Sequence, residues 1–509
     1  MGLYDLTFYD IICRNAVCYK TRSAWFEADD NRSLTFAQYK EQVDRLACGL
    51  QKVGVQRHDR IGVLAKNSME YFFLYGAAGA IGAIMLPVNW RLSTNEIAFN
   101  LNDCEPSIFF VDPEYHAMIN ESLNRFPTVK SFCSLKSEGE GFKAIDELMA
   151  NDGSLMKADI SSDDDFVIIH TAAVTGRPRG ALLSHANILC SNLHFIYYLK
   201  ITQEDVHLNL LPMFHIAGLV TATSAFHAGA LNVNMSRFDA EKAVNLIEDR
   251  KASFFFDFAP ILSNILDQQA KADKSICSLR AVVGIDVPKI IEKYQEISRG
   301  TFYCMYGQTE TSCLVTVGPY NNCPGAAGQP ILLGNVHIVD DNDKPVPAGS
   351  PGEIIIRGPM VFRGYWNLMD DNTYTFRNEW HHTGDLGRFD DEGFLWYVGR
   401  KADKELIKPG GENVYPAEVE KVALQHPAVE KCVVIGVPDP KWKEGIKAVC
   451  QLKSGVKFTA KELIQFIGSR IASYKKPQYV EFIPEIPLCS DGTPDRSKIK
   501  ELYGGEQKI

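Results

Sequence analysis

The sequence predicts an α/β protein of two domains. A large N-terminal domain, residues 1–400, has mixed β-sheets covered by helices and a small antiparallel β region at about 320–398, and a small α+β domain follows at 401–509. Three observations lead to this fold class. The length of 509 residues suits several domains. Buried β-rich runs alternate with helical patterns up to about residue 320, and turn residues separate short β-rich runs beyond it.

Composition excludes several classes of protein. Hydrophobic residues make up 46% of the chain and charged residues 23%, as in globular proteins with large cores. The sequence has no run of roughly 18 apolar residues, which a membrane helix needs, and its start lacks a secretory signal pattern. Its 13 cysteines are scattered without a Cys-x-x-Cys pair. We therefore expect a reducing, cytoplasmic location and neither a disulfide framework nor a zinc site.

Charge is spread unevenly along the chain. The formal net charge of −10 argues against a nucleic-acid-binding protein. From Lys401 onward there are 18 Lys and Arg residues against 15 Asp and Glu, whereas the first 400 residues have 35 against 48. The basic C-terminal part favours contact with a polyanionic ligand. A solvated lysine-rich surface is the equally open alternative.

The N-terminal elements follow in order from their hydrophobic patterns. Apolar residues at helical spacing predict a helix over Thr35–Val53, and Arg60–Ala65 is typical of a buried strand. The small residues of Gly76–Gly82 allow a helix to pack closely on a sheet. Phe166–Thr171 predicts a second buried strand, and the alternation of strands and helices continues to about Tyr320.

The remaining elements are shorter. In the antiparallel region, strands are expected at Val336–Val339, Glu353–Arg357 and Phe394–Val398, the last after a hairpin turn at 390–393. A linker at Arg400–Lys408 leads into the C-terminal domain. The elements predicted there are a helix from Pro416 to Leu424, strands at Val429–Val437 and Lys447–Leu452, and a helix from a Thr459–Glu462 capping box to Ile471.

One glycine-rich turn is a candidate anion site. The segment His170–His185 runs from a buried strand through a loop that contains Gly176, Arg179 and Gly180, and enters a helix at about Ala186. Such a turn can aim backbone N–H groups at an anion while one basic side chain supplies charge. It lacks the Walker pattern G-x-x-x-x-G-K-[ST]. Taken alone, the segment indicates a structural turn more strongly than a phosphate site.

Four further stretches give this turn a context. They are Tyr306-Gly307-Gln308-Thr309-Glu310, Trp380-His381-His382-Thr383-Gly384-Asp385-Leu386, Gly399-Arg400 and Gly410-Gly411-Glu412-Asn413-Val414-Tyr415-Pro416. In this order and spacing, the five stretches resemble the adenylate-forming superfamily of acyl-CoA synthetases, luciferases and peptide-synthetase adenylation domains. The resemblance covers nearly the whole chain, from Leu34-Thr35-Phe36 to the C-terminal domain.

The resemblance implies an enzyme that uses ATP, Mg²⁺ and coenzyme A, with a role for each matching residue. Tyr306 would stack on adenine, Thr309 would bond the α-phosphate, and Glu310 would bind Mg²⁺. Asp385 would accept the ribose hydroxyls, and Arg400 would contact ribose or phosphate. The other residues implied in ATP or AMP binding are Thr171, Thr175, Gly176, Arg179, Gly284, Gly307 and Gln308.

For thioester formation, the resemblance implies a small mobile C-terminal domain that rotates about a hinge after Arg400. Gly410 and Gly411 would then form a wall of the tunnel for the pantetheine arm, because bare backbone admits a ligand closely. Trp442 would stack on the CoA adenine, with surface packing as the alternative. The lysines expected near the CoA phosphates are Lys441, Lys443, Lys475 and Lys476, each of which could equally belong to a solvated face.

The acyl pocket is expected at two places in the sequence. His215 matches the family position that gates the carboxylate and is a candidate catalytic residue. Phe256, Phe258, Ile285 and Asp286 fall where the family lines its pocket. The aromatic run and the bulky Ile285 favour a short or medium acid, or a ring-containing one that is aromatic or alicyclic, over a long chain. The phenylalanines could equally be plain core residues.

Two departures from the family pattern bear on adenylation. The usual phosphate loop is T-S-G-T-T-G-x-P-K-G, and here Ala172–Val174 replace two hydroxyls and one glycine. In the final motif, normally P-K-T-x-S-G-K-[IV]-x-R, Thr493 stands where the adenylation lysine belongs. Lys498 and Lys500 lie just beyond it and are the first candidates for the missing catalytic cation. Arg179 on the phosphate loop is the rival candidate.

The leading hypothesis is an AMP-forming acyl-CoA synthetase that acts on a small-molecule carboxylate, ATP and CoA. We expect a monomer or homodimer with no nucleic-acid partner and no stable membrane insertion. We expect no carrier-protein domain after the C-terminal domain, which favours this hypothesis over an enzyme that loads a separate carrier protein or runs a luciferase-like oxidation. A third hypothesis is a catalytically weakened protein that binds a nucleotide or acyl-CoA, supported by the altered phosphate loop and the missing lysine.

Overall fold

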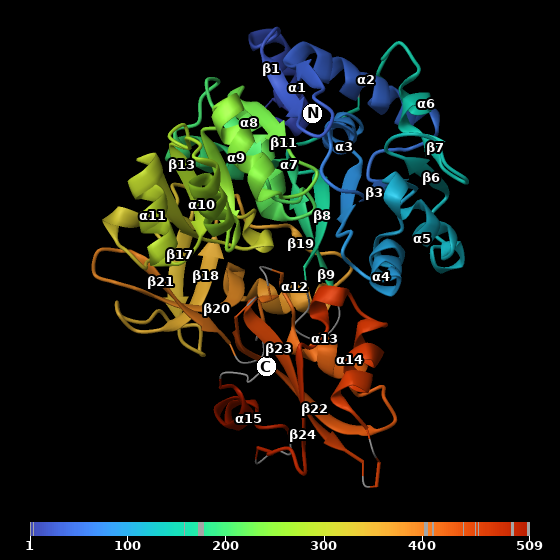
Figure 1. Ribbon diagram of the computed structural model, residues 1–509. Helices are drawn as coiled ribbons and strands as arrows, with labels where there is room; N and C mark the ends of the chain where they lie inside the picture. Colours follow the sequence, from blue (N-terminus) through green and yellow to red (C-terminus); the bar gives the residue numbers. More distant parts are fainter. Residues whose placement is uncertain are drawn as a thin grey trace. The chain divides into compact units, whose positions relative to one another are not determined.

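The chain forms two compact units (Figure 1). The computed structural model describes residues 2–3, 5–156, 158–171, 178–401, 406–409, 412–440, 442–453, 455–456, 458–489 and 493–505. Unit 1 comprises Met1–Trp90, Leu101–His170 and Gly180–Gly399, and unit 2 comprises Arg91–Asn100, Thr171–Arg179 and Arg400–Ile509.

Two large mixed sheets form the centre of unit 1. The first has parallel pairs in its middle and antiparallel pairs at both ends. Its strands, in order, are β16 (Gln329–Pro330), β15 (Thr316–Pro319), β14 (Thr301–Tyr306), β13 (Ala281–Ile285), β12 (Phe254–Phe258), β10 (Val206–Asn209), β11 (Leu231–Asn234), β1 (Ser23–Glu27) and β2 (Ser33–Thr35).

The second large sheet is parallel from β8 to β7. Its strands, in order, are β19 (Gly364–Tyr365), β9 (Arg179–Ser184), β8 (Asp165–Thr171), β4 (Ile84–Val88), β3 (Arg60–Leu64), β5 (Ile108–Val111), β6 (Ser131–Ser134) and β7 (Lys143–Ala144). The strands predicted at 60–65 and 166–171 are β3 and β8, whereas β9, between the glycine-rich loop and the following helix, was not expected.

Helices cover these sheets and begin at caps that the sequence encodes. Thr35 and Ser184 form capping boxes that open α2 and α7. The helices are α1 (Phe8–Cys18), α2 (Phe36–Lys52), α3 (Met69–Ile81), α4 (Thr94–Cys104), α5 (His116–Asn120), α6 (Ile145–Met149), α7 (His185–Leu199), α8 (Ile216–Ala228), α9 (Ala240–Arg250), α10 (Ile261–Ala272), α11 (Pro288–Ser298) and α12 (Met369–Thr375).

The alternation of side chains along β12 separates two hydrophobic cores. Phe254 and Phe256 belong to one cluster, with residues of α2, α3, α7 and α8, whereas Phe255 belongs to another, with residues of α9 and α10. Figure 1 shows α9, α10 and α11 together beside this sheet. A strand that is apolar on both faces suits the interior of a sheet covered on both sides.

A small antiparallel sheet completes unit 1. Its order is β17 (Asn335–Val339), β18 (Gly352–Arg357), β20 (His381–Phe389) and β21 (Leu395–Arg400). The strands predicted at 336–339, 353–357 and 394–398 correspond to β17, β18 and β21. Strand β20 was not predicted, because Gly384 and Gly387 inside it are signals of a turn rather than of a strand.

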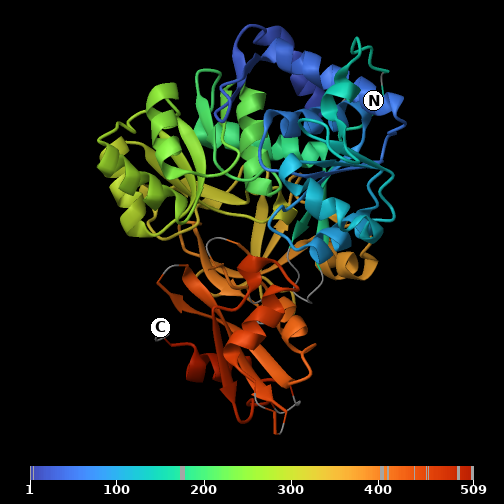
Figure 2. The ribbon, with the colours of Figure 1, turned by 45° about the vertical axis from the view of Figure 1, so that its right-hand side comes forward.

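The C-terminal part of unit 2 is an α+β fold. Strand β22 (Val429–Asp439) pairs antiparallel with β23 (Lys443–Leu452), which pairs parallel with β24 (Tyr479–Ile483). Helices α13 (Pro416–Ala423) and α14 (Ala460–Gly468) share a hydrophobic cluster with Cys432 and Val434, and α15 (Arg496–Tyr503) shares another with Val433 and Ile435. Alternate residues of β22 thus face opposite sides of the sheet. Figures 1 and 2 show α13 and α14 on one side of these strands and α15 on the other.

The structure agrees with the predicted fold class. Thr459 forms the expected capping box at the start of α14. No helix among the described residues has the length and apolar character to cross a membrane. All 13 cysteines are free thiols.

Candidate active site

Several of the expected site residues of unit 1 lie at or just beyond the carboxyl ends of neighbouring parallel strands. Strand β12 ends at Phe258, β13 at Ile285 and β14 at Tyr306. Phe258 pairs with Ile285, and Gly284 pairs with Cys304 of β14, so these strand ends lie side by side. In open α/β sheets, this edge is where ligands bind.

Two glycines allow close backbone approaches at this edge. A Cβ atom at Gly284, whose φ is +152°, would lie 1.9 Å from the backbone oxygen of Asp257. At Gly307, a Cβ atom would lie 1.8 Å from the backbone oxygen of Cys313. Neither place has room for a side chain. Gly307 lets the chain turn tightly after β14 into the 3₁₀ turn Thr309–Thr311.

Asp385 on β20 is the centre of a buried hydrogen-bond network. Its carboxylate is 2% exposed, and its Oδ2 accepts a hydrogen bond from the Tyr306 hydroxyl at 2.8 Å and another from Gln308 Nε2. His381 Nε2 lies 3.4 Å from Gln308 Oε1. The donors offset the cost of burying a carboxylate and fix its direction, which a carboxylate that binds ribose hydroxyls requires.

Glu310 is buried in the turn that follows Gln308. Its Oε1 accepts a hydrogen bond from the Tyr365 hydroxyl at 2.9 Å. Its Oε2 accepts no hydrogen bond from any residue that the structure describes. One carboxylate oxygen is therefore oriented by Tyr365 and the other is suited to a hard cation. Thr309, half-buried beside it, begins the same turn.

Of the expected acyl-pocket residues, one lies in the hydrophobic core and three lie at the carboxyl edge of the sheet. Phe256 is 1% exposed, and its ring lies 6.3 Å from Phe195 and 5.0 Å from Phe258, which agrees with the alternative that it is a core residue. Phe258 is half-buried, Ile285 is 49% exposed, and Asp286 follows β13 directly. The three edge residues, rather than Phe256, are positioned to meet a ligand.

His215 stands at the N-terminus of α8 and is half-buried. The segment before it is held by Asn67, whose Nδ2 donates to Leu211 O at 2.7 Å and whose Oδ1 accepts from Met213 N at 2.8 Å. The Tyr75 hydroxyl donates to Met213 O at 2.8 Å. These three bonds set the path of the chain into His215.

The phosphate loop is described only at its two ends. Thr171 closes β8 and Arg179 opens β9, and Thr171 Oγ1 donates a hydrogen bond to Arg179 O at 3.4 Å. Thr175, Gly176 and the substituted positions 172–174 lie outside the described residues. The roles expected for them stay predictions.

In unit 2, Arg400 belongs to the expected nucleotide site, and the exposed Trp442 belongs to the expected CoA site. Arg400 Nη1 donates a hydrogen bond to the Tyr415 hydroxyl at 3.0 Å. Trp442 is 40% exposed, next to Lys443, which is also exposed. Part of the Trp442 side chain is therefore accessible to solvent. Gly410, Gly411 and Lys441 lie outside the described residues.

Lys475 does not fit the CoA contact expected for it. Its side chain is 3% exposed, and its Nζ lies 2.6 Å from both Glu418 Oε2 and Glu96 Oε1. Burial acts to lower the pKa of Lys475, but the carboxylates, Glu418 above all, outweigh it and raise the pKa above its ordinary value. A CoA phosphate would have to displace two buried carboxylates. Lys475 is thus an internal ion-pair partner of unit 2, and its neighbour Lys476 is exposed.

The candidate replacement cations lie on α15. Asp495 caps this helix by accepting a hydrogen bond from Lys498 N at 2.9 Å, and Arg496 anchors it through Glu420 at 2.7 Å. The side chains of Lys498 and Lys500 are exposed on the helix. Because the two lysines are two residues apart on a helix, their side chains point from different faces of it. The face that each occupies determines which of them can reach a ligand.

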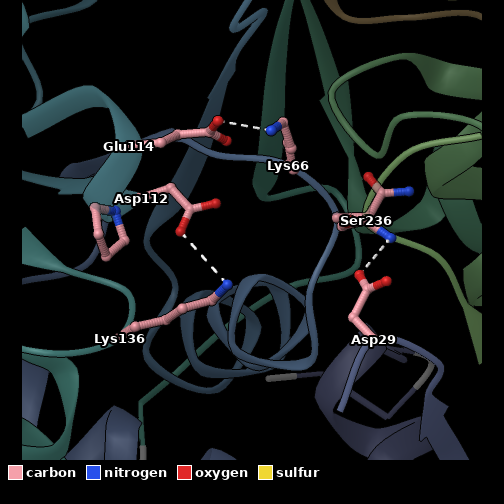
Figure 3. Close-up of a pocket in the computed structure, with 8 residues that line it drawn as sticks. Asp29, Lys66, Asp112, Glu114, Lys136 and Ser236 are labelled. Carbon is pink, nitrogen blue, oxygen red and sulfur yellow. Dashed lines mark hydrogen bonds and ion pairs between the residues drawn. The ribbon is translucent and has the colours of Figure 1, made fainter.

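A separate cavity of about 340 Å³ opens elsewhere in unit 1 (Figure 3). Lys66 lies 2.6 Å from Glu114 and Lys136 lies 3.7 Å from Asp112 within it. Figure 3 shows both ammonium groups directed at these carboxylates. Since each lysine has an acidic partner, the cavity has no excess positive charge for a phosphate, and none of the adenylation residues lines it.

Sequence reasoning missed the residues that orient the site. Tyr365, His381 and Asn67 contact Glu310, Gln308 and the segment before His215. Tyr365 had one local signal, because it follows Gly364, whose φ of +137° marks a turn that few other residues adopt. The contacts themselves join residues far apart in the chain, which local patterns do not encode.

Comparison with known proteins gives consistent matches. A family model described as AMP-binding enzyme matches residues 14–366, and one described as AMP-binding enzyme C-terminal domain matches residues 418–492. Indoleacetate–CoA ligase of Aromatoleum aromaticum is 31% identical over 92% of this chain and 93% of its own length. Feruloyl-CoA synthase of an Amycolatopsis species is 30% identical over 93% of this chain and 94% of its own.

Solved structures show the same likeness. A Rhodopseudomonas palustris protein described as a long-chain-fatty-acid CoA ligase is 41% identical with a TM-score of 0.75, covering 78% of this chain and 100% of that one. A double mutant of o-succinylbenzoate CoA synthetase from Bacillus subtilis is 26% identical with a TM-score of 0.86, covering 98% and 99%. Because the first family model spans more than half of the chain and the relatives align with nearly all of it, this chain belongs to the family of AMP-binding enzymes.

Proposed function

We propose that the protein is an AMP-forming ligase that couples a ring-containing carboxylic acid to coenzyme A. The observation that carries the proposal is the Asp385 network, in which Tyr306 and Gln308 orient a buried carboxylate. Glu310 follows Gln308 closely in the chain, with one oxygen oriented by Tyr365. The site thus offers an aromatic ring, a carboxylate for ribose and an oxygen ligand for a metal ion.

The first half-reaction would form an acyl-adenylate. The carboxylate of the acid attacks the α-phosphorus of ATP, so that an oxygen–phosphorus bond forms and the bond to pyrophosphate breaks. The protein contributes positioning and charge neutralisation. Tyr306 would lie against adenine, Asp385 would accept the ribose hydroxyls, and Thr309 would donate to the α-phosphate. The loop between Thr171 and Arg179 would hold the outer phosphates.

The residues present fit a magnesium ion. Glu310 supplies a carboxylate oxygen, the ligand type that Mg²⁺ prefers, and the hydrogen bond from Tyr365 orients that carboxylate. A bound Mg²⁺ would neutralise charge on the phosphates of ATP. Tyr365 would then act on the metal only through Glu310.

The second half-reaction would transfer the acyl group to CoA. The CoA thiolate attacks the carbonyl carbon of the adenylate, a carbon–sulfur bond forms, and AMP leaves. We propose that the C-terminal domain, residues 401–509, supplies the CoA contacts and changes its position between the half-reactions. Gly410 and Gly411 would line the pantetheine arm, and Trp442 and Lys443 would face the nucleotide part.

Two observations support a ring-containing acid. The curated relatives described above are named for indoleacetate and ferulate, both of which contain aromatic rings. In this chain, Phe258 and Ile285 are adjacent at the strand edge and present bulky apolar side chains. Such a surface suits a flat ring. We also propose that the enzyme is cytoplasmic and is a monomer or homodimer.

A pyrophosphate-release assay tests the proposal. The purified protein with ATP and Mg²⁺ is given indole-3-acetate, ferulate, 2-succinylbenzoate, octanoate or palmitate, with and without CoA, and the products are identified by mass spectrometry. We expect at least one ring acid to give pyrophosphate and, with CoA, its thioester. Asp385→Asn is the matched control for the nucleotide site.

The other outcomes distinguish the alternatives. Faster turnover of palmitate than of every ring acid would contradict the assignment of the acid. Pyrophosphate release without a CoA thioester would favour an enzyme that loads a carrier protein. Binding of AMP or acyl-CoA without pyrophosphate release from any acid would favour a weakened binding protein.

A further inference from the structure

We propose that Glu353 on β18 is a positioning residue for nucleotide recognition, because it stabilises the β-bulge that orients the Asp385 side chain. The inference rests on the proposed function, in which Asp385 accepts the ribose hydroxyls. It assigns a task to a buried carboxylate that would not itself contact the nucleotide.

The bulge is visible in the pairing of β18 with β20. Glu353 pairs with Leu386 and Ile355 pairs with His382. The paired positions are therefore two residues apart on β18 but four residues apart on β20. Asp385 lies in the extra length of β20. Bulges beside active sites turn a side chain away from the direction that the regular ladder would give it.

Side chains satisfy the backbone groups that the bulge removes from the ladder. Glu353 Oε1 accepts a hydrogen bond from Gly384 N at 2.8 Å, where Gly384 has a φ of +69°. Thr383 Oγ1 accepts from Asp385 N at 3.0 Å and donates to Ile354 O at 2.7 Å. Without these bonds, buried N–H and C=O groups would be unpaired, and the strand would favour a more regular register.

The same carboxylate is fixed from its other side. Glu353 is buried, and its Oε2 lies 3.1 Å from Arg377 Nη2 and 3.2 Å from His382 Nδ1. Asp343 shares this cluster, with both of its oxygens 3.1 Å from Arg377. The two carboxylates and His382 are metal-ligand types, but the guanidinium of Arg377 already bridges the carboxylates. The cluster is therefore an ion-paired anchor for Glu353 rather than a metal site.

Asp343 provides a matched control. Changing Asp343 to asparagine removes one negative charge from the same Arg377–His382 cluster. Among the described residues, no hydrogen bond joins Asp343 to Gly384. Glu353→Leu and Asp343→Asn thus each remove one negative charge from the ion cluster, but only Glu353→Leu removes the acceptor for Gly384 N. If only the Glu353 variant loses nucleotide preference, the loss reflects a changed orientation of the Asp385 side chain.

The experiment compares ATP with 2′-deoxy-ATP by isothermal titration calorimetry on the full chain with Mg²⁺. Loss of one hydrogen bond to a charged group costs roughly tenfold or more in affinity, so the wild type should prefer ATP by at least about tenfold. We expect Glu353→Leu to lose most of this preference and to approach Asp385→Asn, whereas Asp343→Asn keeps it. Glu353→Asp, which retains the charge but shortens the side chain, should show the same loss if the leucine variant does not fold.

Two results would overturn the inference. If Glu353→Leu or Glu353→Asp is less stable to heat but keeps the wild-type preference for ATP, Glu353 has a structural role alone. If the wild type binds both nucleotides equally, the ribose contact of Asp385 is absent, and the nucleotide site of the proposed function fails with it. The first result leaves the proposed function intact, so the two failures are distinguishable.

Discussion

Single side chains determine the charge of the proposed adenylation site. Glu310 is the expected metal ligand, and Tyr365, which donates a hydrogen bond to its carboxylate, is not itself an expected ligand. The two residues should therefore give different phenotypes when each is changed: loss of the ligand removes the site for the ion, whereas loss of the hydroxyl leaves the ligand in place but less well oriented.

Glu310→Ala should lower the rate of pyrophosphate release by about 10²–10³-fold, because charge on the phosphates is no longer neutralised. Tyr365→Phe should raise the Mg²⁺ concentration at half-maximal rate by about tenfold and keep the maximal rate. Rates measured across a magnesium titration separate the two effects. Tyr197→Phe, at an exposed position, is the control, and a Tyr365→Phe titration that matches it would refute the role of the hydroxyl.

His185 gives a second prediction for a single residue, on stability against pH. Its Nδ1 accepts a hydrogen bond from Phe8 N at 3.3 Å, and burial lowers the pKa of His185 to about 4. An unfolded chain has a histidine pKa of roughly 6.5, so between these values the unfolded state binds more protons and stability falls as pH falls.

His185→Gln keeps an acceptor but removes this titration. The variant should therefore lose about 2 kcal/mol less than the wild type in free energy of unfolding between pH 7 and pH 5. Urea unfolding at the two pH values measures the difference, and effects common to both proteins cancel. Parallel losses in the two proteins would show that His185 does not titrate as its burial indicates.

At the scale of secondary-structure elements, the site depends on connections between distant segments. Asn67 lies in the turn between β3 and α3. Its side chain forms hydrogen bonds with the backbone of Leu211 and of Met213, the two ends of the segment that leads to His215. This link fixes the path of the connection from β10 to α8. It contacts no residue of the Asp385 network among the described residues.

Asn67→Ala should raise the KM for the acid by about tenfold, because two buried hydrogen bonds are lost and the His215 segment relaxes. The affinity for ATP should stay unchanged. Steady-state kinetics with the acid and ATP varied in turn test this split, with exposed Asn102→Ala as the control. Equal changes in both constants would show a general loss of structure instead.

Helix α15 carries the candidates for the missing cation. If Lys498 or Lys500 replaces the lysine absent at Thr493, its change to alanine should slow adenylation by about 10²–10³-fold in both directions, because one transition state serves both. Thr493→Lys should raise the rate. Single-turnover adenylate formation and its reversal with pyrophosphate provide the measurement. If none of the three variants alters either rate, no cation of this segment takes part.

The sequence predicted elements better than it predicted their contacts. Helix α2 and strands β3, β8, β17 and β18 follow from local patterns, because burial imposes a period on side chains wherever the partner lies. Strand β20 escaped prediction because its glycines serve a bulge whose partner, Glu353, is remote in sequence. The burial of Lys475 escaped prediction for the same reason, since only the tertiary structure brings Glu418 to it.

The motifs grouped three residues that the structure also brings together. Asp385, Tyr306 and Gln308 were expected together and form one network. Phe256, in contrast, was ambiguous, because an aromatic residue on a buried strand suits a core and a pocket equally. The orienting residues Tyr365 and Asn67 act through other residues, and no pattern of their own distinguishes them.

For the whole molecule, the division into two units accords with a reaction of two steps. We expect Gly410→Leu to slow thioester formation by at least about 10²-fold while adenylate formation stays near the wild-type rate, because a side chain would block only the pantetheine arm. Quenched-flow assays of each half-reaction make the comparison. Similar losses in both half-reactions would contradict separate roles for the two domains. Gly505→Leu, at a glycine with open space around it and no positive φ, is the control.

The placement of the free thiols gives each unit its own reporter of opening. Cys48, Cys133 and Cys313 are buried in unit 1, and Cys432 and Cys450 are buried in unit 2 with their sulfur atoms 3.4 Å apart. A buried thiol reacts with an alkylating reagent only when the structure around it opens. The order in which these cysteines are labelled, determined peptide by peptide, therefore ranks the local stabilities of the two units without any engineered probe.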